Sequence, residues 1–255
     1  MIHQAPLISI IVCMNSDNPF MDAAFDSLSA ACKDIPVEKI LVTNGGYIPR
    51  QSIADNFDKV IHAALGGLGY ARNRGVESAS AKFITFFDSD DILERSYVQR
   101  LMAEISTGIL RKEVYAYSGT KNIDAEGNPL QPSMSARLSK QPNAALWYKH
   151  PYTGATLVIP RDKFIQVGGY KWGGYAEDYE LSIRLRSTFG APAFFQDNYY
   201  IYRLHGNAMS SGKKNKILGV LAIQSYAFIS GKGAAYAVGM FVSTIRFMLC
   251  KLRLA

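Results

Sequence analysis

The chain of 255 residues is long enough for one full-sized domain and an appendage. Hydrophobic residues make up 48% and charged residues 19%, a globular composition without repeats or low-complexity segments. A net charge of +7 favours an anionic partner, such as a nucleotide diphosphate, an acidic membrane or nucleic acid. Cys13, Cys32 and Cys250 have no metal-binding spacing and, with no secretory leader in view, predict a reduced, cytoplasmic protein.

The first elements alternate between strands and helices. A continuous apolar run over residues 7–13 predicts a buried parallel strand, and Asn15 follows at its carboxyl end. Helical spacing extends from Phe20 to Cys32. Residues 38–42 predict a second strand, which ends in a turn that contains Asn44. An ordinary Asn-Gly turn and a contact to a nucleotide base remain open for Asn44, whose amide can both donate and accept.

A glycine-rich turn at residues 66–69 leads into a helix. Ala71, Gly75 and Ala79 fall on one narrow side of this helix, so it can lie close against a sheet. Arg72 lies near its first turn, where free backbone amides also favour an anion.

The stretch from Lys82 to Asp91 joins a buried strand to a group of carboxylates. Five β-branched or aromatic residues precede Asp88, Asp90 and Asp91. A central parallel strand presents its next residues at the carboxyl edge of the sheet, where α/β proteins bind ligands. Two acids one residue apart can there hold a divalent cation, which in turn holds a diphosphate. A solvated acidic turn is the alternative interpretation.

The second half of the chain continues the alternation. It predicts helices over 94–105 and 175–185, strands over 114–118, 153–161, 193–195 and 199–204, and a hairpin or loop over 122–131. In the helix over 175–185, Asp178 shares a face with Leu181 and Leu185, so its carboxylate should point inward. Glu180 and Arg184 are expected to form a surface ion pair. The pattern as a whole predicts an α/β fold with a doubly wound, mostly parallel sheet.

Several motifs, in order, resemble the family 2 glycosyltransferases. They are Ala71-Arg72-Asn73-Arg74-Gly75, Asp88-Ser89-Asp90, Thr153-Gly154-Ala155, Gly168-Gly169-Tyr170, Glu177-Asp178 and Tyr202-Arg203-Leu204-His205. The resemblance covers residues 7–211 and implies a GT-A type fold. It also implies an inverting transfer of a sugar from a nucleotide-diphosphate donor, with a UDP-sugar favoured, to an acceptor hydroxyl. The acceptor would be a glycan or a lipid-linked sugar in surface polysaccharide or lipopolysaccharide assembly, and no nucleic acid would be bound.

The resemblance also implies roles for individual residues. Asp178 would be the catalytic base, and Mg2+ or Mn2+ would be held by Asp90 and His205. The remaining candidates are the donor-binding residues Asn15, Asn44, Arg72 and Asp88 and the acceptor-side residues Glu177 and Trp147. Core packing is the alternative for Trp147. A nucleotidyltransferase would normally carry a basic glycine-rich loop after its first strand, which Met14-Asn15-Ser16 is not.

The sequence divides into a catalytic domain over 1–212 and a C-terminal helical extension over 213–255. The extension opens with Lys213, Lys214 and Lys216, and its longest uncharged stretch is too short to span a membrane. Its mixed basic and apolar helix predicts attachment to the inner face of an anionic membrane. Packing on its own domain or on a second subunit in a homo-oligomer is the alternative. A non-catalytic membrane-surface protein is the third functional alternative.

Overall fold

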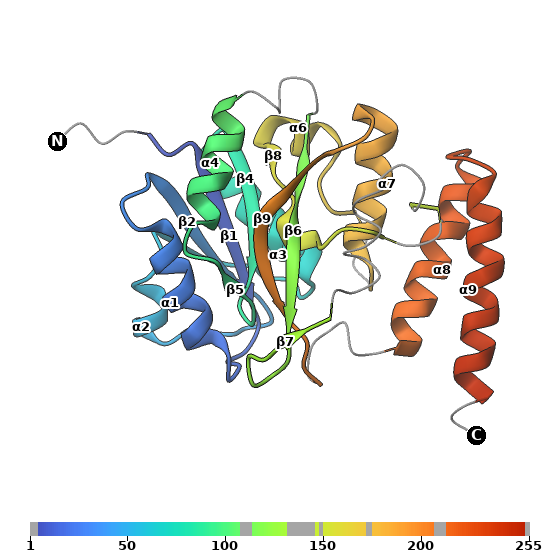
Figure 1. Ribbon diagram of the computed structural model, residues 1–255, viewed down its shortest axis with the longest axis horizontal. Helices are drawn as coiled ribbons and strands as arrows, with labels where there is room; N and C mark the ends of the chain where they lie inside the picture. The colour runs from blue at the N-terminus through green and yellow to red at the C-terminus, as the bar shows by residue number, and fades with distance from the viewer. Residues whose placement is uncertain are drawn as a thin grey trace.

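The computed structural model describes residues 5–107, 114–131, 146–147, 150–171, 175–206 and 213–252. Its main sheet has the order β3-β2-β1-β4-β8. The parallel strands are β1 (Ile8–Met14), β2 (Val37–Thr43), β3 (Lys59–His62) and β4 (Phe83–Asp88), and the short β8 (Ile159–Pro160) is antiparallel to β4. The prediction of a mostly parallel α/β sheet is confirmed (Figure 1).

A second sheet lies over the carboxyl half of the first. Its order is β5-β9-β6-β7, formed by β5 (Ile92–Leu93), β9 (Ala193–Arg203), β6 (Ala116–Ile123) and β7 (Pro129–Leu130). The strands β6 and β9 run parallel, with an irregularity in register after Ser118. The predicted hairpin over 122–131 is the antiparallel pair of β6 and β7. Because β5 directly follows Asp91 and pairs with the end of β9, this sheet brings Arg203 and His205 beside the acidic turn.

Helices cover both faces of the main sheet. They are α1 (Met21–Cys32), the short α2 (Gln51–Ala54), α3 (Leu68–Ser78), α4 (Tyr97–Thr107), α6 (Arg161–Gln166) and α7 (Glu177–Phe189). The chain continues into α8 (Lys213–Ile229) and α9 (Ala235–Leu252), which pack side by side beyond α7 (Figure 1).

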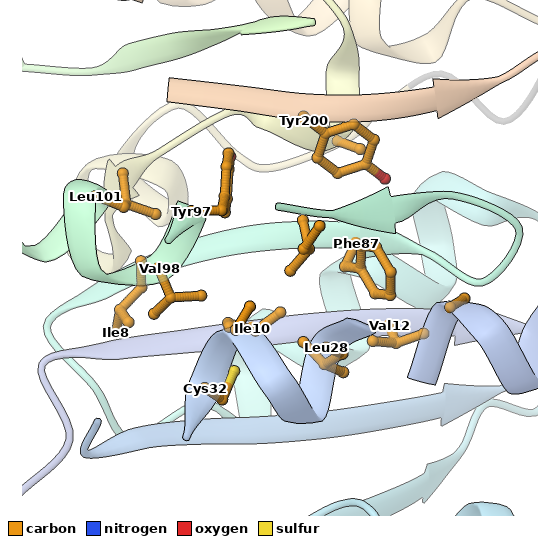
Figure 2. Close-up of a cluster of buried hydrophobic side chains, with 14 of the residues drawn as sticks. Ile8, Ile10, Val12, Leu28, Cys32, Phe87, Tyr97, Val98, Leu101 and Tyr200 are labelled. Atoms are coloured by element: carbon orange, nitrogen blue, oxygen red, sulfur yellow. The ribbon is translucent and has the colours of Figure 1, made fainter. Parts of the chain in front are cut away.

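Two hydrophobic clusters fill the space above and below the sheet. Alternate residues of β1 point to opposite faces, as the two-residue period of a strand requires: Ile10 and Val12 face α1 and α4, whereas Ile11 faces α3. Figure 2 shows the first cluster, in which Phe87 and Tyr200 join the main sheet to the second sheet. On the other face Gly75 is essential to the close approach of α3, because a Cβ there would lie 2.4 Å from Cγ2 of Ile11. The predicted narrow side of that helix is confirmed.

The prediction of one strand over residues 153–161 needs correction. Residues 153–161 form a 3-10 turn at Gly154–Thr156 and the two-residue strand β8, instead of one strand. This apolar run is buried because it lies between the two sheets, and only short stretches pair with Ala116 and Ile84. The strand β3 and the helix α2 were not predicted, since their side chains are only partly buried and the apolar signal is weak. The sequence pattern over residues 136–148 predicts neither a helix nor a strand, and of these residues the structure describes Leu146 and Trp147.

The C-terminal helical pair has its own small core. Ile223, Ala227 and Tyr236 from the pair meet Tyr179 and Ile183 of α7. Opposite this core, α9 exposes a row of large apolar side chains, namely Val238, Phe241, Ile245, Met248 and Leu249. Among the described helices, none is both long and apolar enough to cross a membrane.

Candidate active site

The carboxyl ends of β4 and β9 bring the acidic turn and His205 together. Nε2 of His205 lies 2.9 Å from Oδ2 of Asp90. The imidazole is nearly buried and packs against the ring of Phe20, with ring centroids 4.7 Å apart. The side chains of Asp88 and Asp90 keep 30% and 29% of their surface exposed. Two carboxylates are therefore open to a ligand at this edge, and the nearly buried imidazole of His205 lies beside Asp90. The binding of a metal by these residues stays a prediction.

The backbone beneath these carboxylates is fixed by buried hydrogen bonds. Arg203 donates its amide to Oδ1 of Asp91 at 2.7 Å and its guanidinium to the carbonyl of Asp90 at 3.0 Å. The amide of Asn18 donates to Oγ of Ser89 at 3.1 Å. Burial and the neighbouring carboxylates raise the pKa of Asp91 well above its usual range, so Asp91 is part of the scaffold.

This donor set fits a hard divalent cation shared with a substrate. Within the described parts of the chain, no group of three or more His, Cys, Asp or Glu side chains is arranged to hold a metal ion by itself. Mg2+ in particular usually takes only one or two protein carboxylates and completes its shell with water and substrate phosphates. An open pair of Asp90 and His205, with Asp88 beside it, has that character.

Arg72 occupies the middle of the site. It is buried, and it contacts Oδ1 of Asp88 at 2.8 Å and Oε1 of Glu177 at 3.3 Å. Its guanidinium also lies over the rings of Phe86 and Tyr170. The predicted contact of Arg72 with the donor stays a prediction. In the structure its charge is already matched by two carboxylates, which come from β4 and from α7.

Asp178 and Glu177 stand at the start of α7, after Ala176 in the left-handed conformation. The side chain of Asp178 is 28% exposed, and its Oδ2 lies 3.4 Å from Nδ1 of His150. Burial raises the pKa of Asp178, but the charge and hydrogen bond of His150 outweigh burial and lower that pKa to about 2. Asp178 is therefore a carboxylate at neutral pH, in a position to accept a proton.

Glu177 differs from its neighbour. It is buried and faces Arg72. Burial, followed by the charge of Asp178, raises the pKa of Glu177 to about 7 in spite of Arg72. The predicted role of Glu177 on the acceptor side is untested, and the structure places its carboxylate against Arg72.

The other predicted residues lie farther from this centre. Asn15 is exposed after β1. Asn44 is buried. In the orientation that gives both side-chain amide atoms a partner, its nitrogen donates to the carbonyl of Met14 and its oxygen accepts from the backbone N–H of Gly67. Its side chain thus joins two backbone segments, and its contact with a nucleotide base stays a prediction. Trp147 packs against the cluster beneath the C-terminal helices, and its carbonyl accepts from Gln224 of α8 at 3.0 Å.

The predicted surface pair Glu180–Arg184 is wrong in its location. The two side chains do pair, at 2.5 Å, but they are 7% and 11% exposed. Arg184 also donates to the carbonyls of Val167 and Gly169, at 2.6 Å each. The i, i+4 spacing predicts the pair correctly but does not reveal that the loop before α7 folds over it.

Sequence reasoning missed His150 entirely. A single histidine carries no spacing signal, and only the fold brings it to Asp178. It also missed the function of Asn73, whose amide donates to the carbonyl of Tyr170 at 2.8 Å and accepts from the amide of Tyr170 at 2.9 Å. The motif containing Arg72 and Asn73 thus binds both the acidic turn and the glycine turn before α7.

An acidic turn at the carboxyl edge of a mostly parallel sheet, beside a carboxylate that heads a helix, defines a GT-A type glycosyltransferase fold. The family model for glycosyl transferase family 2 matches residues 9–173, and the chain belongs to this family.

Curated relatives agree with the family. The uncharacterized glycosyltransferase EpsJ of Bacillus subtilis is 27% identical over 221 residues, which are 80% of this chain and 63% of EpsJ. The O-antigen biosynthesis glycosyltransferase WbnJ of Escherichia coli is 25% identical over 219 residues, 79% of this chain and 81% of WbnJ. The chain spans less than two thirds of the length of EpsJ and of the putative glycosyltransferase EpsH of Bacillus subtilis.

Solved structures share the fold at low identity. TarS of S. aureus in complex with UDP-GlcNAc superposes with a TM-score of 0.68 and 15% identity, over 91% of this chain and 71% of that one. The mannosyltransferase PcManGT of Pyrobaculum calidifontis, in complex with GDP-Man and Mn2+, gives 0.67 and 11% identity over 94% and 69%.

Proposed function

We propose that this protein is an inverting glycosyltransferase that moves a sugar from a nucleotide-diphosphate sugar, with a UDP-sugar favoured, to an acceptor hydroxyl. The acceptor would be a glycan or a lipid-linked sugar in the assembly of a surface polysaccharide. The observation that carries the proposal is the division of the site. Asp88, Asp90 and His205 form an open acidic edge, Asp178 is a separate ionised carboxylate, and Arg72 joins the two through Asp88 and Glu177.

Each side of the site has its own task in this proposal. Asp90, with Asp88 and His205, would hold Mg2+ or Mn2+, which when bound neutralises charge on the departing diphosphate. Asp178 removes the proton from the acceptor hydroxyl, whose oxygen attacks the anomeric carbon as the bond to the diphosphate breaks. A single displacement inverts the anomeric centre and needs no nucleophile from the protein. The complexes of TarS with UDP-GlcNAc and of PcManGT with GDP-Man and Mn2+ support this choice of donor class and cation.

The proposal is tested by a transfer and hydrolysis screen with UDP-glucose, UDP-galactose, UDP-GlcNAc and GDP-mannose, with and without Mn2+. In the Asp178→Asn variant we expect the donor affinity to stay within a few-fold while single-turnover transfer falls about 100-fold or more. The Asp90→Ala variant should instead lose the Mn2+ dependence of UDP binding, measured by calorimetry.

Three outcomes would contradict the assignment. Near-normal transfer by Asp178→Asn would mean that another group is the base. A loss of donor affinity as large as the loss of rate would place Asp178 in the nucleotide site. Undiminished Mn2+-dependent binding by Asp90→Ala would remove the metal assignment.

We also propose that the C-terminal extension attaches the enzyme to an anionic membrane, where a lipid-linked acceptor would be found. Seven of the 28 Lys and Arg residues lie in residues 213–255, which contain no Asp or Glu, so residues 1–212 carry 21 basic and 21 acidic residues. The whole net charge therefore belongs to the extension. On α9 the exposed apolar side chains at 238, 241, 245, 248 and 249 occupy roughly 100° of the helix circumference, the form of an interfacial helix.

Vesicles of phosphatidylcholine with and without phosphatidylglycerol test this attachment. Flotation of the full chain should require the anionic lipid and weaken with salt, since each basic residue near such a surface contributes about 1 kcal/mol. The double substitution Phe241→Ser/Met248→Ser should abolish flotation, whereas Ile165→Ser, at another exposed apolar residue, on α6, should not. If the double variant floats normally, or instead dissociates a dimer seen by light scattering, α9 is not a membrane contact.

A further inference from the structure

Four polar side chains form a continuous path from Asp178 into the protein. Nδ1 of His150 lies 3.4 Å from Oδ2 of Asp178, and Nε2 on the opposite side of the ring lies 2.7 Å from Oγ of Ser182. Oγ of Ser182 in turn lies 2.7 Å from the hydroxyl of Tyr117. His150 is 11% exposed on its side chain, and Ser182 and Tyr117 are buried.

The hydroxyl proton of Ser182 determines the proton positions along this path. It is donated to the carbonyl of Asp178, one turn earlier in α7, at 2.8 Å. The lone pairs of Oγ are then left to accept from the hydroxyl of Tyr117 and from Nε2–H of His150. In this arrangement Nε2 carries the ring proton, so a neutral ring presents the bare Nδ1 to the carboxylate of Asp178.

The ring of His150 is held in an aromatic surround. Its centroid lies 5.7 Å from Tyr152, 5.9 Å from Tyr179 and 6.3 Å from Tyr117. In the described part of the chain, these three phenols and Asp178 are titratable groups that lie against it. Asp178 itself is also influenced by the charges of Arg72 from α3 and Lys216 from α8, beside its neighbour Glu177.

We propose that His150 is a positioning residue for the catalytic base, and that its Nδ1 shares the proton that Asp178 removes from the acceptor hydroxyl. This inference rests on the proposed function of Asp178. In the reaction the acceptor O–H bond breaks and the oxygen bonds to the anomeric carbon, while the diphosphate leaves with the electron pair of its bond. The proton stays between Oδ2 of Asp178 and Nδ1 of His150 until it passes to solvent.

Sharing the proton between Asp178 and His150 compensates for the weak basicity of Asp178. A carboxylate whose proton affinity is as low as that of Asp178 beside a charged imidazole is a weak base. With the neutral ring beside it, the carboxylate has a second acceptor for the incoming proton. The active form is thus the one with no proton between Oδ2 of Asp178 and Nδ1 of His150. We therefore expect kcat to rise with pH until that proton is lost.

The test compares His150→Asn and His150→Gln with the wild type in single-turnover transfer, using the donor that the screen identifies. Asn places an N–H near the position of Nδ1 and Gln near that of Nε2, so each keeps one contact, but neither can take a proton. Both should lower kcat about 10-fold or more with donor KM unchanged, and both should lose the acid limb of the kcat profile. Asp178→Asn, measured beside them, tests the base itself.

A second measurement needs no activity. The full chain has four histidines, so 15N-histidine spectra of the wild type can be assigned by the signal missing from His150→Asn. The neutral ring should show a protonated Nε2 and a bare Nδ1. The inference is overturned if His150→Asn keeps the wild-type kcat and pH profile, if donor KM changes instead of kcat, or if the ring is the Nδ1–H tautomer. A fully active Asp178→Asn would overturn the proposed function as well.

Discussion

At the scale of single residues, Arg72 determines how the two halves of the site are held. A buried guanidinium is stable only when its charge and its donors are matched, and here Asp88 and Glu177 match them from separate elements. The planar fork of arginine reaches both carboxylates at once, which the single ammonium of lysine cannot do.

We therefore expect Arg72→Lys to lose one of the two ion pairs. The free energy of unfolding should fall by about 1.5–3 kcal/mol, the usual range for a hydrogen bond to a charged group, and kcat should fall with it. Denaturant unfolding and steady-state transfer are the measurements. Arg74→Lys is the matched control, because Arg74 is exposed and pairs with Glu77, one turn away. Equal stabilities of the two variants would contradict the role of Arg72.

Glu38 gives a prediction about pH. Its buried carboxylate accepts from Ser9 and Ser80 and lies 2.7 Å from Nζ of Lys59. Burial raises its pKa, but Lys59 and the serine donors outweigh burial and lower it from 4.5 to about 2. Because the folded pKa lies below the unfolded one, this stabilisation is complete above pH 4.5 and is lost as the pH falls towards 2.

Glu38→Gln should thus lower the free energy of unfolding by about 3 kcal/mol at pH 7. In this variant the free energy of unfolding should also fall less steeply as the pH is lowered. Unfolding in urea at pH 3, 4, 5 and 7 measures both effects. Glu77→Gln, on an exposed carboxylate, should change neither. If Glu38→Gln falls in stability with acid as steeply as the wild type below pH 4.5, the loss comes from other carboxylates.

At the scale of elements, the segments that carry the family motifs pack closely against one another. A Cβ at Gly169 would lie 2.5 Å from Oδ1 of Asn73, so only glycine lets the turn reach α3. Arg184 of α7 holds the same turn through the carbonyls of Val167 and Gly169. The 3-10 turn at Gly154–Thr156 approaches α7 just as closely, since a Cβ at Gly154 would lie 2.7 Å from Oδ2 of Asp178.

Gly154→Ala should therefore displace the carboxylate of Asp178 without removing it. We expect kcat to fall about 10-fold or more and donor affinity to change little, because a small shift of a catalytic group is costly. Single-turnover transfer and UDP calorimetry separate the two quantities. Gly66→Ala serves as the control for stability, since a Cβ there meets nothing within 4 Å. A wild-type kcat in Gly154→Ala would show that the site tolerates the shift.

How well the sequence predicts these elements depends on how far apart in the chain the residues of each pattern lie. The strands β1, β2 and β4 and the acidic turn are local patterns, and they were predicted correctly together with the start of α7. The pairing of Asp90 with His205 followed from family motifs that lie 115 residues apart. No short pattern encodes how distant loops fold over one another. This folding determines the contact of His150 with Asp178, the burial of Glu180 and the hydrogen bonds that Asn44 makes to the backbone.

At the scale of the whole molecule, the C-terminal helices are part of the packing of α7. A Cβ at Gly219 would lie 2.5 Å from the carbonyl of Tyr175, and one at Gly239 would lie 2.1 Å from the carbonyl of Trp147. Tyr179 and Ile183 of α7 are buried in the cluster shared with α8 and α9. The division of the chain at residue 212 stays a prediction, and this packing gives it a testable consequence.

Deletion of residues 213–255 should destabilise the remaining chain, because burying a large apolar side chain contributes about 1.5–3 kcal/mol. We expect a lower Tm and a loss of transfer even to an acceptor free in solution. The full-length Phe241→Ser/Met248→Ser variant should keep both, since Phe241 and Met248 are exposed. A truncated chain with the Tm and kcat of the full chain would show that the helices are a detachable appendage.

The order of α7, α8 and α9 across the molecule has one more consequence (Figure 1). α9 packs on α8 and α8 packs on α7, and the axes of packed helices lie about 8–10 Å apart. If α9 rests on the bilayer, the base is held at a set height above the lipid. The enzyme would then select lipid-linked glycans by the distance of their growing end from the membrane.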